Sequence, residues 1–242
     1  MTARQAQGRL RILGVLPDRQ KETVLDFLGA IPERLKRTIH TVCSDMYEGY
    51  TEAVREGLPA ARLVIDRFHV AEAYRAGLDQ LRKQELKRLK QTLSQPDYAS
   101  LKGALWALRK SPKDLATEDR QVLRRLFGYA PNVKRAYALQ QELTTIFDQP
   151  FTQAQAKRRL SAWIQHVRTS GLACFDAFLQ TLETWWEAIT AFFVLRANSG
   201  FVEGLNNKLK VLKRRCYGLF NRQHWFQRIF LDLEGYHWFG LA

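Results

Sequence analysis

Residues 38–70 contain two short apolar runs, and each run ends close to an aspartate. The run TIHTVC precedes Asp45 by one serine, and the run LVI directly precedes Asp66. Short β-branched and apolar runs bounded by polar residues are typical of strands that are covered on both faces. Between them, apolar residues at helical spacing, followed by Gly57 and Pro59, predict a helix. The order strand, helix, strand predicts a parallel unit with both aspartates at its carboxyl edge, where ligands bind in open α/β sheets.

The segments on either side of this unit predict an α/β protein with a long helical region. Residues 9–16 predict a first strand and residues 20–28 a helix, so the first seventy residues should form a parallel sheet with helices on its faces. After His69 no strand pattern occurs until about residue 195, and the periodicity there is helical. In that region, Thr152 and Gln155 have the spacing of a capping box. Four tryptophans are expected in the core between helices: Trp106, Trp163, Trp185 and Trp186.

The charge of the chain restricts its partners. Lys and Arg number 38 against 24 Asp and Glu, which gives a formal net charge of +14. Such an excess favours polyanions, nucleic acid before acidic membrane. No apolar run approaches the roughly 18 residues that a spanning helix needs, and residues 1–11 lack the apolar centre of a signal peptide. The three cysteines have neither zinc nor disulfide spacing. We therefore expect a reduced cytoplasmic protein, associated with the nucleoid and without a membrane partner.

A second informative stretch covers residues 198–230. Apolar residues recur there every three or four positions, and on the opposite face Glu203 stands at the head of a basic row. Residues 204–231 contain seven Lys or Arg and no acid. A solvated helix face is the usual role of a charge run, but the missing acids favour DNA binding. The predicted DNA-contacting residues are Asn207, Lys208, Lys210, Lys213, Arg214, Arg215 and Arg222.

Three carboxylates beside a basic surface suggest phosphodiester chemistry. Two divalent ions about 3.5–4 Å apart can activate water or a 3′-hydroxyl and stabilise the leaving oxygen. Mg²⁺ suits carboxylate ligands of this kind, and Mn²⁺ is the alternative. By itself the pattern has a simpler explanation, because an aspartate at the end of a strand often caps the next turn or helix.

Two long segments of the chain resemble a known family. SDMYEGYTEAVREGLPAARLVIDRFHV and NSGFVEGLNNKLKVLKRRCYGLFN closely resemble the catalytic domain of DDE-type transposases from the ISL-three group of bacterial insertion sequences. The resemblance implies a ribonuclease-H-like core over residues 1–71 and 197–242, incomplete at its amino end, and an all-helical insertion over residues 72–196. It also implies Mg²⁺- or Mn²⁺-dependent cleavage and strand transfer, with transposon ends and target DNA as partners.

The same resemblance assigns roles to individual residues. Asp45 matches the second catalytic aspartate and Glu203 the catalytic glutamate, and both would be metal ligands. Asp66 and His69 match a D-x-x-H signature with a supporting role at the active site. For Asp66, capping of the helix that begins near Phe68 is an equally good interpretation.

The resemblance also implies what the chain lacks. The first catalytic aspartate of the family lies on a strand upstream of residues 10–16, and Asp18 belongs to a turn and does not replace it. The cysteine-rich zinc module and helix-turn-helix of such enzymes are also expected to be missing. Two functions stay open, and with them whether the chain is an enzyme. One is a transposase, impaired by truncation, that needs an upstream transposase fragment or a homo-oligomer. The other is a non-catalytic DNA-binding or subunit-associating remnant.

Overall fold

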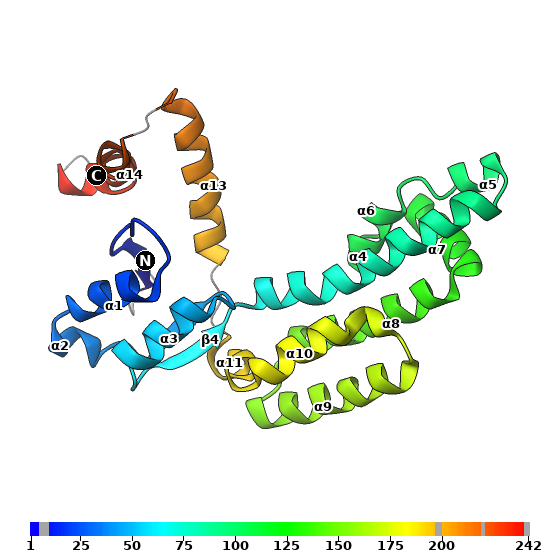
Figure 1. Cartoon of the computed structure of the whole chain (residues 1–242), viewed down its shortest axis with the longest axis horizontal. Coiled ribbons are helices and arrows are strands. Elements are labelled where there is room, and N and C mark those ends of the chain that lie inside the picture. Colours follow the sequence, from blue (N-terminus) through cyan, green and yellow to red (C-terminus); the bar gives the residue numbers. More distant parts are fainter. Residues whose placement is uncertain (5–9, 197–199, 219–220, 240–242) are drawn as a thin grey trace. The chain divides into compact units, whose positions relative to one another are not determined.

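The computed structural model describes the chain outside residues 5–9, 197–199, 219–220 and 240–242 (Figure 1). Two compact units are present, and each contains helices. Unit 1 comprises Met1–Leu63 and Asn198–Ala242, and unit 2 comprises Val64–Ala197. Helices together with small sheets agree with the predicted α/β class.

The first strands of unit 1 form a small sheet of their own. Strand β1 (Thr2–Arg4) pairs antiparallel with β2 (Leu10–Ile12), and Ala3 lies opposite Arg11. The predicted strand over residues 9–16 is therefore shorter, and its predicted place in one parallel sheet is wrong. Beyond β2, the backbone N–H groups of Leu13 and Gly14 both donate to the Met1 carbonyl. The amino-terminal segment thus pairs with β2 and binds the two residues that follow it, and the apolar pattern of residues 9–16 does not reveal this pairing.

The predicted strand, helix, strand order of residues 38–70 is confirmed. Strand β3 (Thr41–Ser44), helix α3 (Glu48–Gly57) and strand β4 (Arg62–Ile65) follow one another, and β3 pairs with β4. The Arg62 N–H, at the beginning of β4, donates to the His40 carbonyl just before β3 at 2.9 Å. Because the beginnings of the two paired strands are adjacent, the strands run parallel, as predicted.

Helix α1 (Lys21–Gly29) corresponds to the helix predicted over residues 20–28, and helix α3 packs on it. The core between them consists of Val24, Leu28, Ala53 and Leu58. A Cβ at Gly57 would lie 3.0 Å from Leu28 Cδ1, so the glycine permits this close approach. The other helices of unit 1 are α2 (Glu33–Lys36), α13 (Gly200–Arg215) and α14 (Arg222–Trp238).

The described part of unit 2 consists of helices and their connections, together with the end of β4. Helices α4, α8, α9 and α10 pack along one another (Figure 1). The elements are α4 (Arg67–Thr92), α5 (Gln95–Ala99), α6 (Ala104–Arg109), the 3₁₀ turn η1 (Pro112–Asp114), α7 (Thr117–Tyr129), α8 (Pro131–Asp148), α9 (Gln153–Ser170), the 3₁₀ turn η2 (Ala173–Phe175), α10 (Asp176–Thr184), α11 (Trp186–Thr190) and α12 (Phe192–Leu195). The predicted capping box at α9 is confirmed, because Thr152 Oγ1 accepts from the Gln155 N–H and Gln155 Oε1 from the Thr152 N–H.

The tryptophans of unit 2 divide between core and surface. Trp163 and Trp185 are buried as predicted, and Trp186 is half-buried. The prediction for Trp106 is wrong, because its side chain is 65% exposed. Helix α6 has only six residues, and its buried side is occupied by other residues, namely Ala104, Ala107 and Leu108. The structure joins none of the three cysteines in a disulfide, and burial raises the pKa of the Cys174 thiol to about 11. No helix in the described parts of the chain has the length and apolarity of a membrane span.

Candidate metal and nucleic-acid site

Asp45 lies where the sequence predicts it, directly after strand β3. Its side chain is half-buried, and Oδ1 accepts a hydrogen bond from the Tyr47 N–H at 3.2 Å. This bond holds the carboxylate in the turn that leads into α3. Among the described residues, this is the hydrogen bond that the Asp45 carboxylate forms.

Two tyrosines beside Asp45 were not predicted as part of the site. Tyr47 and Tyr50 pack edge to face with ring centroids 5.2 Å apart, and the Arg19 guanidinium lies 4.8 Å from the Tyr47 ring centroid. The pKa of Tyr50 is raised, first by burial and then by the negative charge of Asp45. Tyr47 is the N-cap of α3 in an extended conformation and Tyr50 lies in the first turn of that helix, so the contact between the two rings depends on the turn geometry and not on a shared helix face.

Asp66 is the N-cap of helix α4. Its side chain is 97% buried, and Oδ1 accepts a hydrogen bond from the Phe68 N–H at 3.1 Å. The capping interpretation of Asp66 is therefore confirmed. His69 follows in the first turn, with Nδ1 3.6 Å from Glu72 Oε2 and its ring 5.5 Å from the Phe68 ring. A supporting role of Asp66 and His69 in catalysis stays a prediction.

Two replacements of Asp66 should show whether the stability of the chain depends on its hydrogen-bond acceptor or on its negative charge. Asn caps helices about as well as Asp, whereas Ala removes the acceptor at a cost of about 0.5–2 kcal/mol. We expect Asp66→Ala to lower the free energy of unfolding by that amount and Asp66→Asn to leave it nearly unchanged. Urea denaturation followed by circular dichroism would measure both variants. Equal stability of the alanine variant and the parent chain would contradict the capping role.

Helix α13 carries the predicted basic row. Leu212 is buried, and Leu205, Leu209 and Cys216 are half-buried, which confirms the apolar stripe. Glu203 lies in the first turn of this helix, but its side chain, like that of Arg222, is outside the described residues. The other predicted DNA-contacting side chains are exposed: Asn207, Lys208, Lys210, Lys213, Arg214 and Arg215.

An acid from the next helix partly offsets the charge of this row. Asp232, in α14, lies 3.9 Å from Lys208 Nζ and 3.6 Å from an Arg228 guanidinium nitrogen. Residues 204–231 contain no acid, and Asp232 is the residue that follows them. The fold brings this carboxylate close to Lys208, near the middle of α13. The positive charge is therefore concentrated toward the carboxyl end of α13, at Lys213, Arg214 and Arg215.

The described carboxylates, histidines and cysteines do not form a cluster of three or more that could hold a metal ion. Asp45 offers a hard oxygen ligand of the kind that Mg²⁺ prefers, and Mg²⁺ needs only one or two protein carboxylates. The predicted pairing of Asp45 with Glu203 falls outside the described side chains and stays a prediction.

Comparison with known proteins gives a consistent result. The transposase of insertion sequence element IS1001 from Bordetella parapertussis is 28% identical over 221 residues, which cover 90% of this chain and 53% of that protein. The transposase of IS1557 from Mycobacterium tuberculosis is 24% identical over 247 residues, 93% of this chain and 55% of that protein. The chain thus spans about half the length of these curated relatives. No solved structure matches it significantly. A family model described as a transposase, DDE_Tnp_ISL3, matches residues 1–229, and the chain therefore belongs to the ISL3 family of insertion-sequence transposases.

Proposed function

We propose that this chain contributes two catalytic carboxylates, Asp45 and Glu203, to the DNA cleavage and strand transfer of an insertion-sequence transposase. The observation that carries the proposal is the position of Asp45 in a member of this family: it follows strand β3, with one oxygen held by the Tyr47 N–H. That hydrogen bond orients the carboxylate before any ligand arrives.

A ribonuclease-H-like core over residues 1–71 and 197–242, with residues 72–196 as a helical insertion, is part of this proposal. The division of the chain supports it, because the segments Met1–Leu63 and Asn198–Ala242 belong to one compact unit. This grouping puts the strand that precedes Asp45 and the helix that carries Glu203 in the same unit, although 157 positions separate the two residues (203 minus 45, less one). The helical insertion would correspond to the other unit.

Asp45 and Glu203 would hold Mg²⁺ or Mn²⁺. When bound, such an ion supplies Lewis-acid activation of the attacking hydroxyl and neutralises charge at the phosphodiester. The residues of the chain would do the rest. The Tyr47 N–H holds the Asp45 carboxylate, and the adjacent Tyr47 and Tyr50 rings would limit the access of water to it. Asp66 and His69 would support the site by fixing the start of α4, and the basic face of α13 would bind transposon-end and target DNA.

The metal ligands can be tested without measuring activity. Fe²⁺ that occupies a Mg²⁺ site produces hydroxyl radicals with ascorbate, and these cut the polypeptide beside the ion. We expect two cleavage zones in the chain, one near Asp45 and one near Glu203, both suppressed by excess Mg²⁺ or Mn²⁺. Asp45→Asn should abolish both zones, because it removes a shared anionic ligand. Mass spectrometry of the fragments would locate the cuts.

Glu48→Gln provides the matched control. Glu48 is an exposed acid in the first turn of α3, three residues beyond Asp45, and should leave the cleavage pattern unchanged. Cleavage near Asp45 without cleavage near Glu203, or cleavage that Asp45→Asn does not alter, would refute the shared site.

A further inference from the structure

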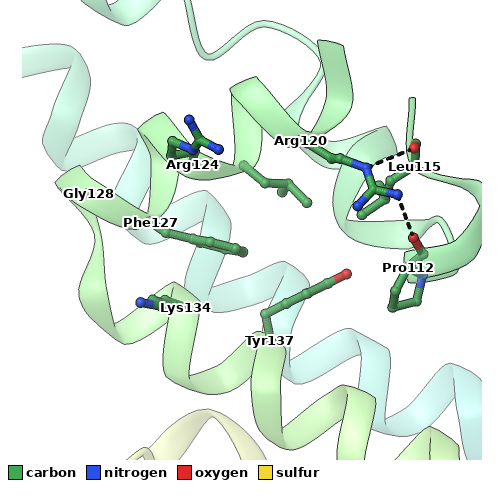
Figure 2. Close-up of a pocket in the computed structure, with 9 residues that line it drawn as sticks. Pro112, Leu115, Arg120, Arg124, Phe127, Gly128, Lys134 and Tyr137 are labelled. Carbon is green, nitrogen blue, oxygen red and sulfur yellow. Dashed lines mark hydrogen bonds between the residues drawn. The ribbon is translucent and has the colours of Figure 1, made fainter. Parts of the chain in front are cut away.

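Unit 2 contains a pocket that no part of the proposed chemistry uses. Helices α7 and α8 and the turn η1 line an open pocket with a volume of about 510 Å³ (Figure 2). This volume falls within the range of roughly 300–1,000 Å³ that is usual for small-molecule sites. Its apolar wall consists of Leu123, Phe127 and Tyr137, and its cations are Arg120, Arg124 and Lys134.

The charges around the pocket are positive and incompletely neutralised. No carboxylate lines it. Arg120 is engaged within the chain, because its guanidinium donates to the carbonyls of Leu115 at 3.2 Å and Pro112 at 3.4 Å. Arg124 and Lys134 are exposed, and neither forms an ion pair with another residue in the described part of the chain. These two cations are therefore available to an anion.

Two aromatic rings face the same space. Phe127 and Tyr137 are half-buried, with ring centroids 5.4 Å apart and planes inclined by 40°. The Tyr137 hydroxyl is buried and has no hydrogen-bond partner among the described residues, although a buried phenol normally has one. In Figure 2, Arg124 and Lys134 lie at one end of the pocket, whereas the Tyr137 hydroxyl points toward the other end, near Pro112. A matching ligand is anionic at one end, flat in the middle and polar at the other end.

We propose that this pocket binds one nucleotide of single-stranded DNA, with its phosphate at Arg124 and Lys134 and its base against Phe127 and Tyr137. Cations combined with aromatic faces are the usual means of binding unpaired nucleic acid, because every base has a face that can stack. A paired base cannot enter, since its faces are already stacked in the duplex. The inference rests on the proposed function only in taking DNA as the substrate.

Gly128 allows the pocket to be filled without disturbing the helix. It lies inside α7 and lines the pocket, and a Cβ built there meets no atom within 4 Å. We expect Gly128→Leu to weaken the binding of a fluorescent oligothymidylate at least fivefold, the lower end of the effect of losing one stacked base (about 1–3 kcal/mol). Fluorescence anisotropy would measure the dissociation constant. Leu and Ala are better helix formers than Gly, so both variants should fold.

Two controls accompany this variant. Gly128→Ala adds only a methyl group and should keep most of the affinity. The double variant Arg124→Gln, Lys134→Gln should also weaken binding and lower the log–log salt slope by about 1.4, as expected for two phosphate contacts on a single strand. Arg125→Gln removes a cation from the same helix as Arg124 but outside the pocket, and it should reduce affinity less than Arg124→Gln alone or Lys134→Gln alone.

Each outcome has a defined meaning. Equal affinity of Gly128→Leu and the parent chain for single-stranded DNA would overturn the inference, and so would a parent chain that binds free dAMP but no oligonucleotide. Duplex binding and the Fe²⁺ cleavage pattern should be unchanged in Gly128→Leu. Lys210→Gln combined with Arg214→Gln, on α13, should weaken duplex binding instead. The experiments can therefore refute nucleotide binding at the pocket without refuting the proposed catalytic function. They can also refute the catalytic function without refuting nucleotide binding at the pocket.

Discussion

Replacing Gly77 with alanine is expected to lower the free energy of unfolding by about 2 kcal/mol, although alanine is the better helix former. Gly77 lies inside α4, where α4 crosses the turn η2. A Cβ there would stand 2.2 Å from the Cys174 carbonyl oxygen and 3.1 Å from its carbonyl carbon. The obstacle is backbone and cannot rotate away, so helix and turn would have to separate. Overpacking at the upper end of about 1–3 kcal/mol exceeds the propensity gain of about 1 kcal/mol.

Gly128→Ala is the matched control for this prediction. Gly128 is also a glycine inside a helix of unit 2, but a Cβ there meets open space. Without a clash, only the propensity term remains, and the variant should gain roughly 0.5–1 kcal/mol. Urea denaturation of both variants under the same conditions would compare them. A Gly77→Ala variant that gains stability to the same extent would show that α4 does not need this close approach.

Trp163→Ala should have the larger effect, a loss of about 3–5 kcal/mol. The Trp163 side chain is fully buried, and its ring packs edge to face against Phe175 and Phe178 at 5.9 Å each. Its indole N–H donates to the Leu139 carbonyl at 2.9 Å. Removing the indole leaves a cavity between α8, α9 and α10 that these helices can only partly close. The loss should appear as a lower urea midpoint with a similar denaturant slope.

Trp106→Ala removes the same side chain from a different environment. Trp106 is 65% exposed, and the Arg109 guanidinium carbon lies 5.9 Å from the centroid of its ring. Surface substitutions of this kind usually change stability by less than about 0.5 kcal/mol. Comparable losses for the two tryptophan variants would mean that Trp163 does not anchor the core of unit 2.

Local patterns account for the features that the sequence predicts correctly. The capping box of Thr152 and Gln155 depends on residues three apart, and the stripe of α13 depends on helical periodicity. The β3–α3–β4 unit is equally local, because its strands and helix follow one another within 25 residues (41 to 65). The family, too, could be identified from two continuous segments, and the match over residues 1–229 confirms it.

At the candidate site, the features predicted correctly also depend on neighbouring residues, whereas the missed features depend on the three-dimensional arrangement. Asp45 follows β3 as predicted, and the hydrogen bond from the Phe68 N–H shows that Asp66 caps α4, whereas its supporting role in catalysis stays a prediction. The contact between the Tyr47 and Tyr50 rings beside Asp45 and the acid that Asp232 provides to Lys208 were missed. Tyr47 and Tyr50 needed the turn geometry, and Asp232 needed the packing of α14 near α13.

The order of strand, helix and strand over β3, α3 and β4, the apolar stripe of α13 and the family of the chain all follow from neighbouring residues, and the sequence was sufficient to predict them. Which surfaces meet depends on the tertiary structure. It paired β2 with β1, left Trp106 exposed, brought α4 against the backbone of Cys174 at Gly77, and opened a pocket beside Gly128. These outcomes depend on contacts between segments far apart in the chain, and the free energy of such contacts is not contained in either segment alone.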